Sequence, residues 1–114
     1  MMDVGEIYTV EIPSSDGHEQ AGIRPAIVIQ APQFENRLPT ILIVLLTSRL
    51  AAQAFPGTLT IQPDSENNLT MTSIALVFQL RAIDKRRLKR RIGRLNTSLL
   101  TQVHQTIKDL FQLP

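Results

Sequence analysis

The sequence predicts a mainly β (α+β) fold in which short strands form a curled barrel or a small sandwich and one helix ends the chain. Short apolar segments separated by turn residues recur between residues 7 and 78. From residue 99 onward, apolar residues recur at intervals of three and four positions instead. A chain of 114 residues usually has one hydrophobic core, so we expect a single domain over residues 1–114.

The predicted strands follow from alternation or from apolar runs that end at Gly, Pro, Asn or Asp. Five strands are predicted, near residues 7–12, 26–30, 40–46, 58–61 and 72–78. Their number and close spacing favour a sheet that curls on itself.

The C-terminal segment has the period of an amphipathic helix. Asn96, Thr97 or Ser98 is expected to cap its first turn. The apolar face comprises Leu99, Leu100, Val103, Ile107, Leu110 and Phe111. We expect this face to pack on the sheet, with His104 at the edge of the core and without a catalytic role.

Composition excludes several classes of site. The chain has no cysteine, which rules out disulfides, a thiolate nucleophile and cysteine-ligated zinc. Asp, Glu and His do not recur at metal-ligand spacing, so we expect neither a metal nor another cofactor. The longest apolar run, residues 41–46, is too short to cross a bilayer, and the N-terminus lacks a signal pattern. We expect a cytoplasmic protein without a membrane partner.

Basic charge is concentrated in one segment. The formal net charge is only +2, yet eight of the 12 lysines and arginines fall within residues 81–94. One interpretation is a surface that binds a polyanion such as RNA. The alternative is a solvated helical turn in which Leu88 and Ile92 point inward together.

Three polar segments adjoin predicted strands. The run Glu-Gln-Ala-Gly-Ile-Arg-Pro at residues 19–25 precedes one strand, Thr-Ser-Arg at 47–49 follows the next, and Gln-Leu-Arg at 79–81 follows the last. Pro25 restricts the residue before it to extended geometry, which holds the Arg24 guanidinium at a defined angle beside a strand.

In this order and spacing, the three segments resemble the MazF/PemK family of toxin endoribonucleases, from Gly5 to Leu95. The resemblance implies an SH3-like barrel of the CcdB/MazF type with a C-terminal α-helix. It also implies a homodimer whose groove binds single-stranded RNA, and a cognate antitoxin that restrains the toxin. The basic segment would suit an acidic antitoxin segment that folds on binding.

The resemblance further implies roles for individual residues. Arg24 and Thr47 would be catalytic, in a metal-independent cleavage that leaves 2′,3′-cyclic phosphate and 5′-hydroxyl ends. The implied RNA-binding residues are Glu19, Gln20, Ser48, Arg49, Gln79 and Arg81. A guanidinium does not deprotonate readily, so Arg24 is expected to stabilise charge or donate a proton, with Glu19 or His18 as candidate proton acceptors. Read alone, Thr47 would make only a local hydrogen bond at a strand end.

Some features depart from the family. Phe78 stands where relatives often have an acidic residue, so the preferred RNA sequence does not transfer. Because the chain has four Phe, one Tyr and no Trp, we expect hydrogen bonds and phosphate contacts to dominate over base stacking. Two alternatives stay open. One is a toxin of the CcdB type that binds gyrase, although the C-terminal Trp motif of those toxins is missing here. The other is an inactive RNA-binding barrel.

Overall fold

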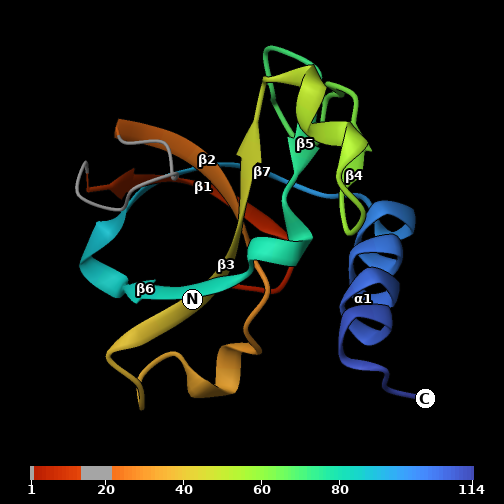
Figure 1. The fold of residues 1–114 in the computed structure, drawn as a ribbon. Helices are drawn as coiled ribbons and strands as arrows, with labels where there is room; N and C mark the ends of the chain where they lie inside the picture. The colour runs from red at the N-terminus through yellow and green to blue at the C-terminus, as the bar shows by residue number, and fades with distance from the viewer. Residues whose placement is uncertain (1, 14–21) are drawn as a thin grey trace.

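The computed structural model describes residues 2–13 and 22–114, which form an antiparallel sheet and one long helix (Figure 1). The strands are β1 (Glu6–Ile12), β2 (Gly22–Val28), β3 (Thr40–Thr47), β4 (Leu59–Ile61), β5 (Ser73–Ala75), β6 (Arg81–Asp84) and β7 (Leu88–Arg94). Short 3-10 helices are η1 (Pro32–Phe34), η2 (Leu50–Ala54), η3 (Val77–Gln79) and η4 (Lys85–Arg87), and the C-terminal helix is α1 (Thr97–Phe111). The mainly β class with a C-terminal helix is therefore confirmed.

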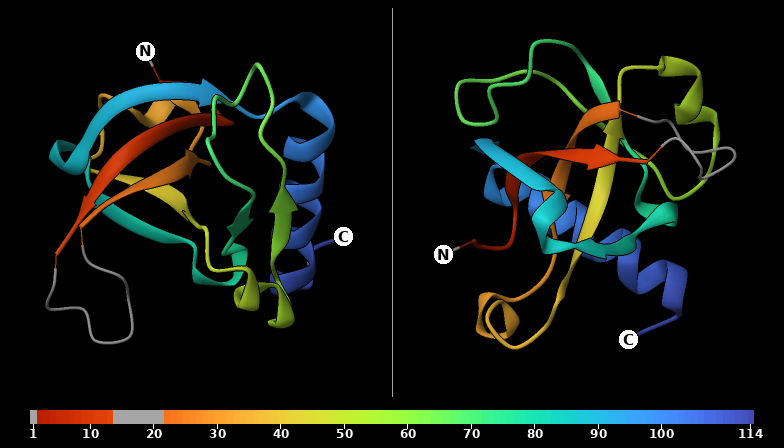
Figure 2. Two further views of the ribbon diagram at one scale, coloured as in Figure 1. Left: turned by 90° about the horizontal axis from the view of Figure 1, so that it is seen from above. Right: turned by 90° about the vertical axis from the view of Figure 1, so that its left-hand side faces the viewer.

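Strand β3 organises the sheet, whose order is β4-β5-β3-β2-β1-β7 with β6 also paired to β3. The first half of β3 pairs with β6, where Ile43 lies opposite Arg81. Its last residues pair with β5, where Thr47 lies opposite Ile74. The sheet therefore divides along β3, and its strands curve around an interior while α1 lies along the β4 and β5 side (Figure 2).

Two apolar clusters occupy the two sides of the curved sheet. The helix-side cluster comprises Ile7, Ile27, Val44, Leu46, Ile61, Ala75, Val77, Leu95 and Val103. The barrel cluster comprises Val10, Ile12, Ala26, Val28, Ile41, Ile43, Leu45 and Ile83. Successive residues of a strand point to opposite faces, so both faces are buried over residues 26–28 of β2 and 43–47 of β3, where the sequence is almost entirely apolar.

Helix α1 begins as predicted, with the Asn96 side chain accepting a hydrogen bond of 2.8 Å from the Leu99 amide. Its apolar face packs against the core through Ile107, and Leu110 lies beside Gly57. Phe111 is 58% exposed, so its predicted packing was wrong. His104 is also exposed rather than at the core edge. It lies about 100° around the helix from the buried Val103.

The basic segment, residues 81–94, spans β6, the 3-10 helix η4 and β7. Leu88 and Ile92 lie on the strand β7 and not in the helical turn considered as the alternative. Strand β7 pairs with β1 through two register shifts. As a result Leu88 packs against the barrel cluster and Ile92 against the helix-side cluster, instead of both pointing the same way. The hydrogen bonds offered by β1 outweigh the low β-propensity of the charged residues.

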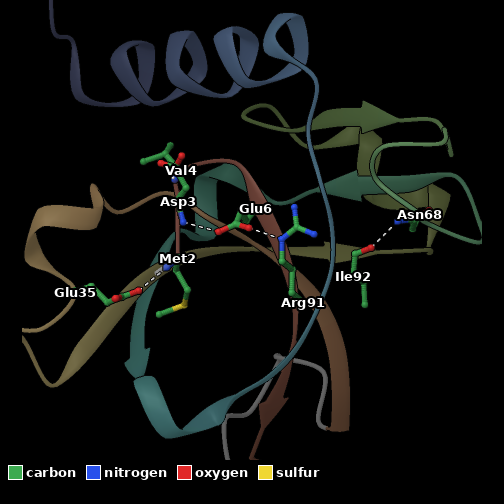
Figure 3. Close-up of polar contacts among 8 residues, drawn as sticks. All are labelled: Met2, Asp3, Val4, Glu6, Glu35, Asn68, Arg91 and Ile92. Atoms are coloured by element: carbon green, nitrogen blue, oxygen red, sulfur yellow. Dashed lines mark hydrogen bonds and ion pairs between the residues drawn. The ribbon is translucent and has the colours of Figure 1, made fainter.

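Polar contacts fix β7 to the rest of the chain (Figure 3). The buried Glu6 carboxylate accepts a hydrogen bond from the Asp3 amide at 2.6 Å and forms an ion pair with Arg91. The Asn68 side-chain amide donates to the Ile92 carbonyl at 2.8 Å. Arg91 therefore has a structural partner, unlike a cation that faces only solvent.

In the described part of the chain, no helix is both long enough and apolar enough to span a membrane.

Candidate functional site

A cavity of about 390 Å³ lies where β2 begins and β3 ends. Four of the residues predicted for the site line it: Arg24, Thr47, Arg49 and Gln79. They come from β2, from the end of β3, from the start of η2 and from η3. The fold thus brings together groups from all three of the sequence segments singled out above.

The register of β2 and β3 explains how two of these residues meet. Ala26 lies opposite Leu45, and both belong to the barrel cluster. The pairing of β2 with β3 ends at Ala26 and Leu45. Two residues farther along each strand, at positions of the same face, Arg24 and Thr47 both line the cavity. The face that is apolar inside the barrel therefore becomes polar at its open end.

Arg24 is held by its strand. Its backbone lies opposite Val10 of β1, and Pro25 fixes the next φ angle. The side chain is half-buried, and among the described residues it has no hydrogen-bond or ion-pair partner. A guanidinium in this setting can bind two oxygens of an anion with its planar fork.

Thr47 is almost completely buried, with 4% of its surface exposed. Its Oγ1 accepts a hydrogen bond from the Arg49 amide at 3.2 Å. The local hydrogen bond considered as its alternative role is thus present. That bond uses a lone pair of the hydroxyl, so the hydroxyl proton stays available to a ligand oxygen in the cavity.

The other predicted residues are less closely grouped. Ser48 faces away from Thr47 and lines a neighbouring cavity of about 170 Å³, which Arg24 also lines. Arg81 is outside the lining of both cavities. Glu19, Gln20 and His18 lie outside the described residues.

The rest of the lining of the larger cavity is apolar, which the sequence patterns did not indicate. Ala51, Ala52, Phe55, Leu76 and Phe78 line it. The rings of Phe55 and Phe78 are in contact, with centroids 5.7 Å apart and planes at 43°. No spacing in the sequence indicates that Phe55 meets Phe78.

Within residues 2–13 and 22–114, no three carboxylate or histidine side chains lie close enough together to hold a metal ion.

Comparisons with known proteins agree on one family. The model of the family described as PemK-like, MazF-like toxin of type II toxin-antitoxin system matches residues 3–111. Endoribonuclease MazF of Staphylococcus saprophyticus is 31% identical over 107 residues, which cover 94% of this chain and 88% of that protein.

Solved structures share the fold. MazF (Form-I) from Deinococcus radiodurans superposes with a TM-score of 0.80 at 24% identity, over 98% of this chain and 97% of that one. An endoribonuclease in complex with its cognate antitoxin from a mycobacterial species gives a TM-score of 0.78 at 14% identity, over 100% and 98% of the two chains. At these identities the structures bear on the fold alone, and they confirm the predicted barrel-like arrangement with a C-terminal helix.

Proposed function

Because the chain belongs to the family of PemK-like, MazF-like toxins of type II toxin-antitoxin systems, we propose that it is an endoribonuclease that cleaves single-stranded RNA at selected sequences. We propose further that the cleavage needs no metal ion and leaves 2′,3′-cyclic phosphate and 5′-hydroxyl ends. The observation that carries this proposal is that Arg24 and Thr47 line one cavity from neighbouring strands.

The residues of the cavity suit phosphoryl transfer through the substrate's own 2′-hydroxyl. The 2′-oxygen attacks the adjacent phosphorus, the bond from phosphorus to the 5′-oxygen breaks, and the departing oxygen gains a proton. Arg24 would bind two phosphoryl oxygens and oppose the charge that builds up there. The Thr47 hydroxyl would donate to one of these oxygens, and Glu19 or His18 would accept the proton of the 2′-hydroxyl.

Around this centre, Arg49 and Gln79 would contact RNA within the same cavity, and Ser48 would do so from the neighbouring one. Arginine binds phosphate, whereas the amide of glutamine both donates to and accepts from base edges. Glu19, Gln20 and Arg81 complete the proposed RNA-binding set, as the family resemblance implies.

We also propose two protein partners. A cognate antitoxin would bind the basic segment, residues 81–94, and block access of RNA. The mycobacterial endoribonuclease of the same fold was solved with its own antitoxin. The exposed cations Lys89 and Arg90 on β7 would suit an acidic segment that orders on binding. A second copy of this chain would form the homodimer expected for the family.

The test incubates purified wild-type and Arg24→Ala proteins with a long unstructured RNA in EDTA, followed by mapping of the new ends and their terminal chemistry. Arg37→Ala is the matched control, since Arg37 is an exposed arginine in the connector before β3, at the opposite end of that strand from Thr47. We expect wild type and Arg37→Ala to leave cyclic phosphate ends at a recurring short sequence.

We expect folded Arg24→Ala to leave the RNA intact. Intact RNA with all three folded proteins would contradict the proposal. If wild type and Arg24→Ala were equally toxic to cells without cutting RNA, a gyrase-binding toxin of the CcdB type would replace it.

A further inference from the structure

The lining of the larger cavity combines two kinds of group. Arg24 and Thr47 supply a cation and a hydroxyl, and Phe55 and Phe78 supply two aromatic rings. Phe55 is 58% exposed, although large apolar side chains usually bury most of their surface, and Phe78 is 37% exposed. A ligand that combines an anion with a flat ring would match both kinds of group at once.

Hydrogen bonds hold the backbone that carries the two rings. The Phe78 amide donates to the Gly57 carbonyl at 3.0 Å. The Phe55 amide donates to the Ala52 carbonyl at 3.1 Å, and its carbonyl accepts from the Thr58 hydroxyl at 2.9 Å. The backbone at both positions is therefore ordered before a ligand binds, which lowers the entropy cost of binding.

Close packing further restricts Phe78. Gly57 has φ of +77°, and a Cβ at this position would lie 3.0 Å from the Cβ of Phe78 and 3.4 Å from Leu110. Glycine thus lets the loop between η2 and β4 pass directly against Phe78. This packing fixes the position of the Phe78 Cβ, from which the ring reaches the cavity and Phe55.

We infer that Phe55 and Phe78 form a stacking platform for the RNA base next to the phosphate that Arg24 binds. This inference rests on the proposed endoribonuclease function and adds a residue-level mode of base recognition to it. A nucleotide has the required chemistry, because its phosphate carries the anion and its base offers a flat face to an aromatic ring. The paucity of aromatic residues led us to expect little stacking, yet the fold gathers two of the five at this cavity.

The occupant is a base rather than a protein segment because the platform is continuous with the polar groups of the cavity. Phe78 immediately precedes Gln79, whose amide can read a base edge, and both line the same space. A stacked base beside Gln79 would present its edge to that amide. Stacking tolerates any base, whereas the amide adds selectivity.

The test measures binding of an RNA that carries the mapped cleavage sequence, with a 2′-deoxynucleotide at the cut to prevent attack. Wild type is compared with Phe55→Leu and Phe78→Leu, which keep an apolar side chain but lose the ring. Phe34→Leu is the matched control, since Phe34 is 45% exposed on η1 and lies outside both cavities. We expect a loss of affinity of about 10-fold to 100-fold for each platform variant and none for the control.

A second arm replaces single bases near the cut with abasic sites. When the missing base is the one that stacks, wild type should bind the abasic RNA more weakly than the intact RNA. Phe78→Leu should bind the two RNAs with equal affinity. Equal penalties for wild type and Phe78→Leu at every position would overturn the inference. So would platform variants that bind RNA normally but change self-association in sedimentation, because the rings would then contact a second copy.

The two failures are distinguishable. If wild type neither binds nor cuts RNA, the proposed function itself fails. If wild type cuts RNA and the platform variants match it in affinity, only the stacking platform fails.

Discussion

Arg24 and Thr47 line the same cavity from neighbouring antiparallel strands, two residues beyond the paired Ala26 and Leu45 of the barrel cluster. The site is thus an extension of a buried sheet face into solvent. The strands fix the backbone positions from which the two side chains enter the cavity, so a cation and a hydroxyl reach the same space from defined points.

Thr47→Val should slow RNA cleavage while leaving the protein folded. Valine keeps the shape of a buried threonine but removes the hydroxyl that would donate to the phosphate, so we expect the rate of RNA cleavage to fall about 100-fold. The Arg49 amide loses its 3.2 Å acceptor, at a cost of about 1 kcal/mol at most in the free energy of unfolding. Single-turnover cleavage assays and urea denaturation measure the two effects.

Thr47→Ser supplies the matched control, because it keeps the hydroxyl and loses only a methyl group. Its cleavage rate should stay within about tenfold of wild type. A serine variant as slow as the valine variant would mean that packing, and not the hydroxyl, is what the site requires.

The exposed cations of β7 should set the salt dependence of RNA binding. Lys89 and Arg90 are exposed on this strand, whereas Arg91 is engaged by Glu6. For single-stranded RNA, each lost phosphate contact should lower the slope of log affinity against log salt by about 0.7. Lys89→Ala and Arg90→Ala should therefore flatten that slope in a fluorescence-anisotropy titration with uncleavable RNA.

Lys108→Ala on α1 removes the same amount of charge at a site away from β7 and should leave the slope unchanged. Equal slopes for wild type and the two β7 variants would show that RNA does not pass over this strand.

Local patterns predicted most of the fold because most strands are apolar runs with clear ends. The predicted 40–46 became Thr40–Thr47, and the predicted 58–61 became Leu59–Ile61. The strands β6 and β7 were missed. The seven residues of β7 include four cations and have little strand propensity of their own. The strand geometry of β7 comes from pairing with β1, a contact between residues about 80 positions apart, and that of β6 from pairing with β3.

The candidate site, like the fold, was predicted only in part. Segments adjoining strands indicated Arg24, Thr47, Arg49 and Gln79, which the fold does bring together. The contact between Phe55 and Phe78 depends on how η2 and η3 are placed in space. No periodicity within either segment carries that information.

Asp84 should make stability depend on pH at the acid end. Hydrogen bonds from the Arg86 side chain and then from its backbone amide hold the pKa of the Asp84 carboxyl well below its usual range. A lowered pKa stabilises the fold above the unfolded value of about 3.9, and this contribution is lost as pH falls below that value toward the folded one. The denaturation midpoints of wild type and Asp84→Asn should therefore differ at neutral pH and converge as pH falls from about 4.

Lys89→Ala tests whether that convergence belongs to the pair of Asp84 and Arg86. It removes the ammonium that donates to the Arg86 carbonyl but leaves the side chains of Asp84 and Arg86 in place, so its difference from wild type should stay nearly constant over the same pH range. If the midpoints of wild type and Asp84→Asn kept a constant separation down to about pH 2, the carboxylate would not be the source of the pH dependence.

Gly93→Ala should be among the most damaging small substitutions in the described chain. A Cβ at this buried position would lie 2.5 Å from the carbonyl oxygens of both Glu66 and Asn67, and these are backbone atoms that cannot rotate away. The adjacent Arg94 amide also donates to the Glu66 carbonyl at 3.0 Å, so the loop cannot retreat without breaking that bond. We expect a loss of about 1–3 kcal/mol in the free energy of unfolding, measured by urea denaturation.

Thr101→Ala, on the exposed side of α1, is the control and should stay within about 0.5 kcal/mol of wild type. A Gly93→Ala variant as stable as this control would mean that the loop carrying Asn67 is free to move away from β7.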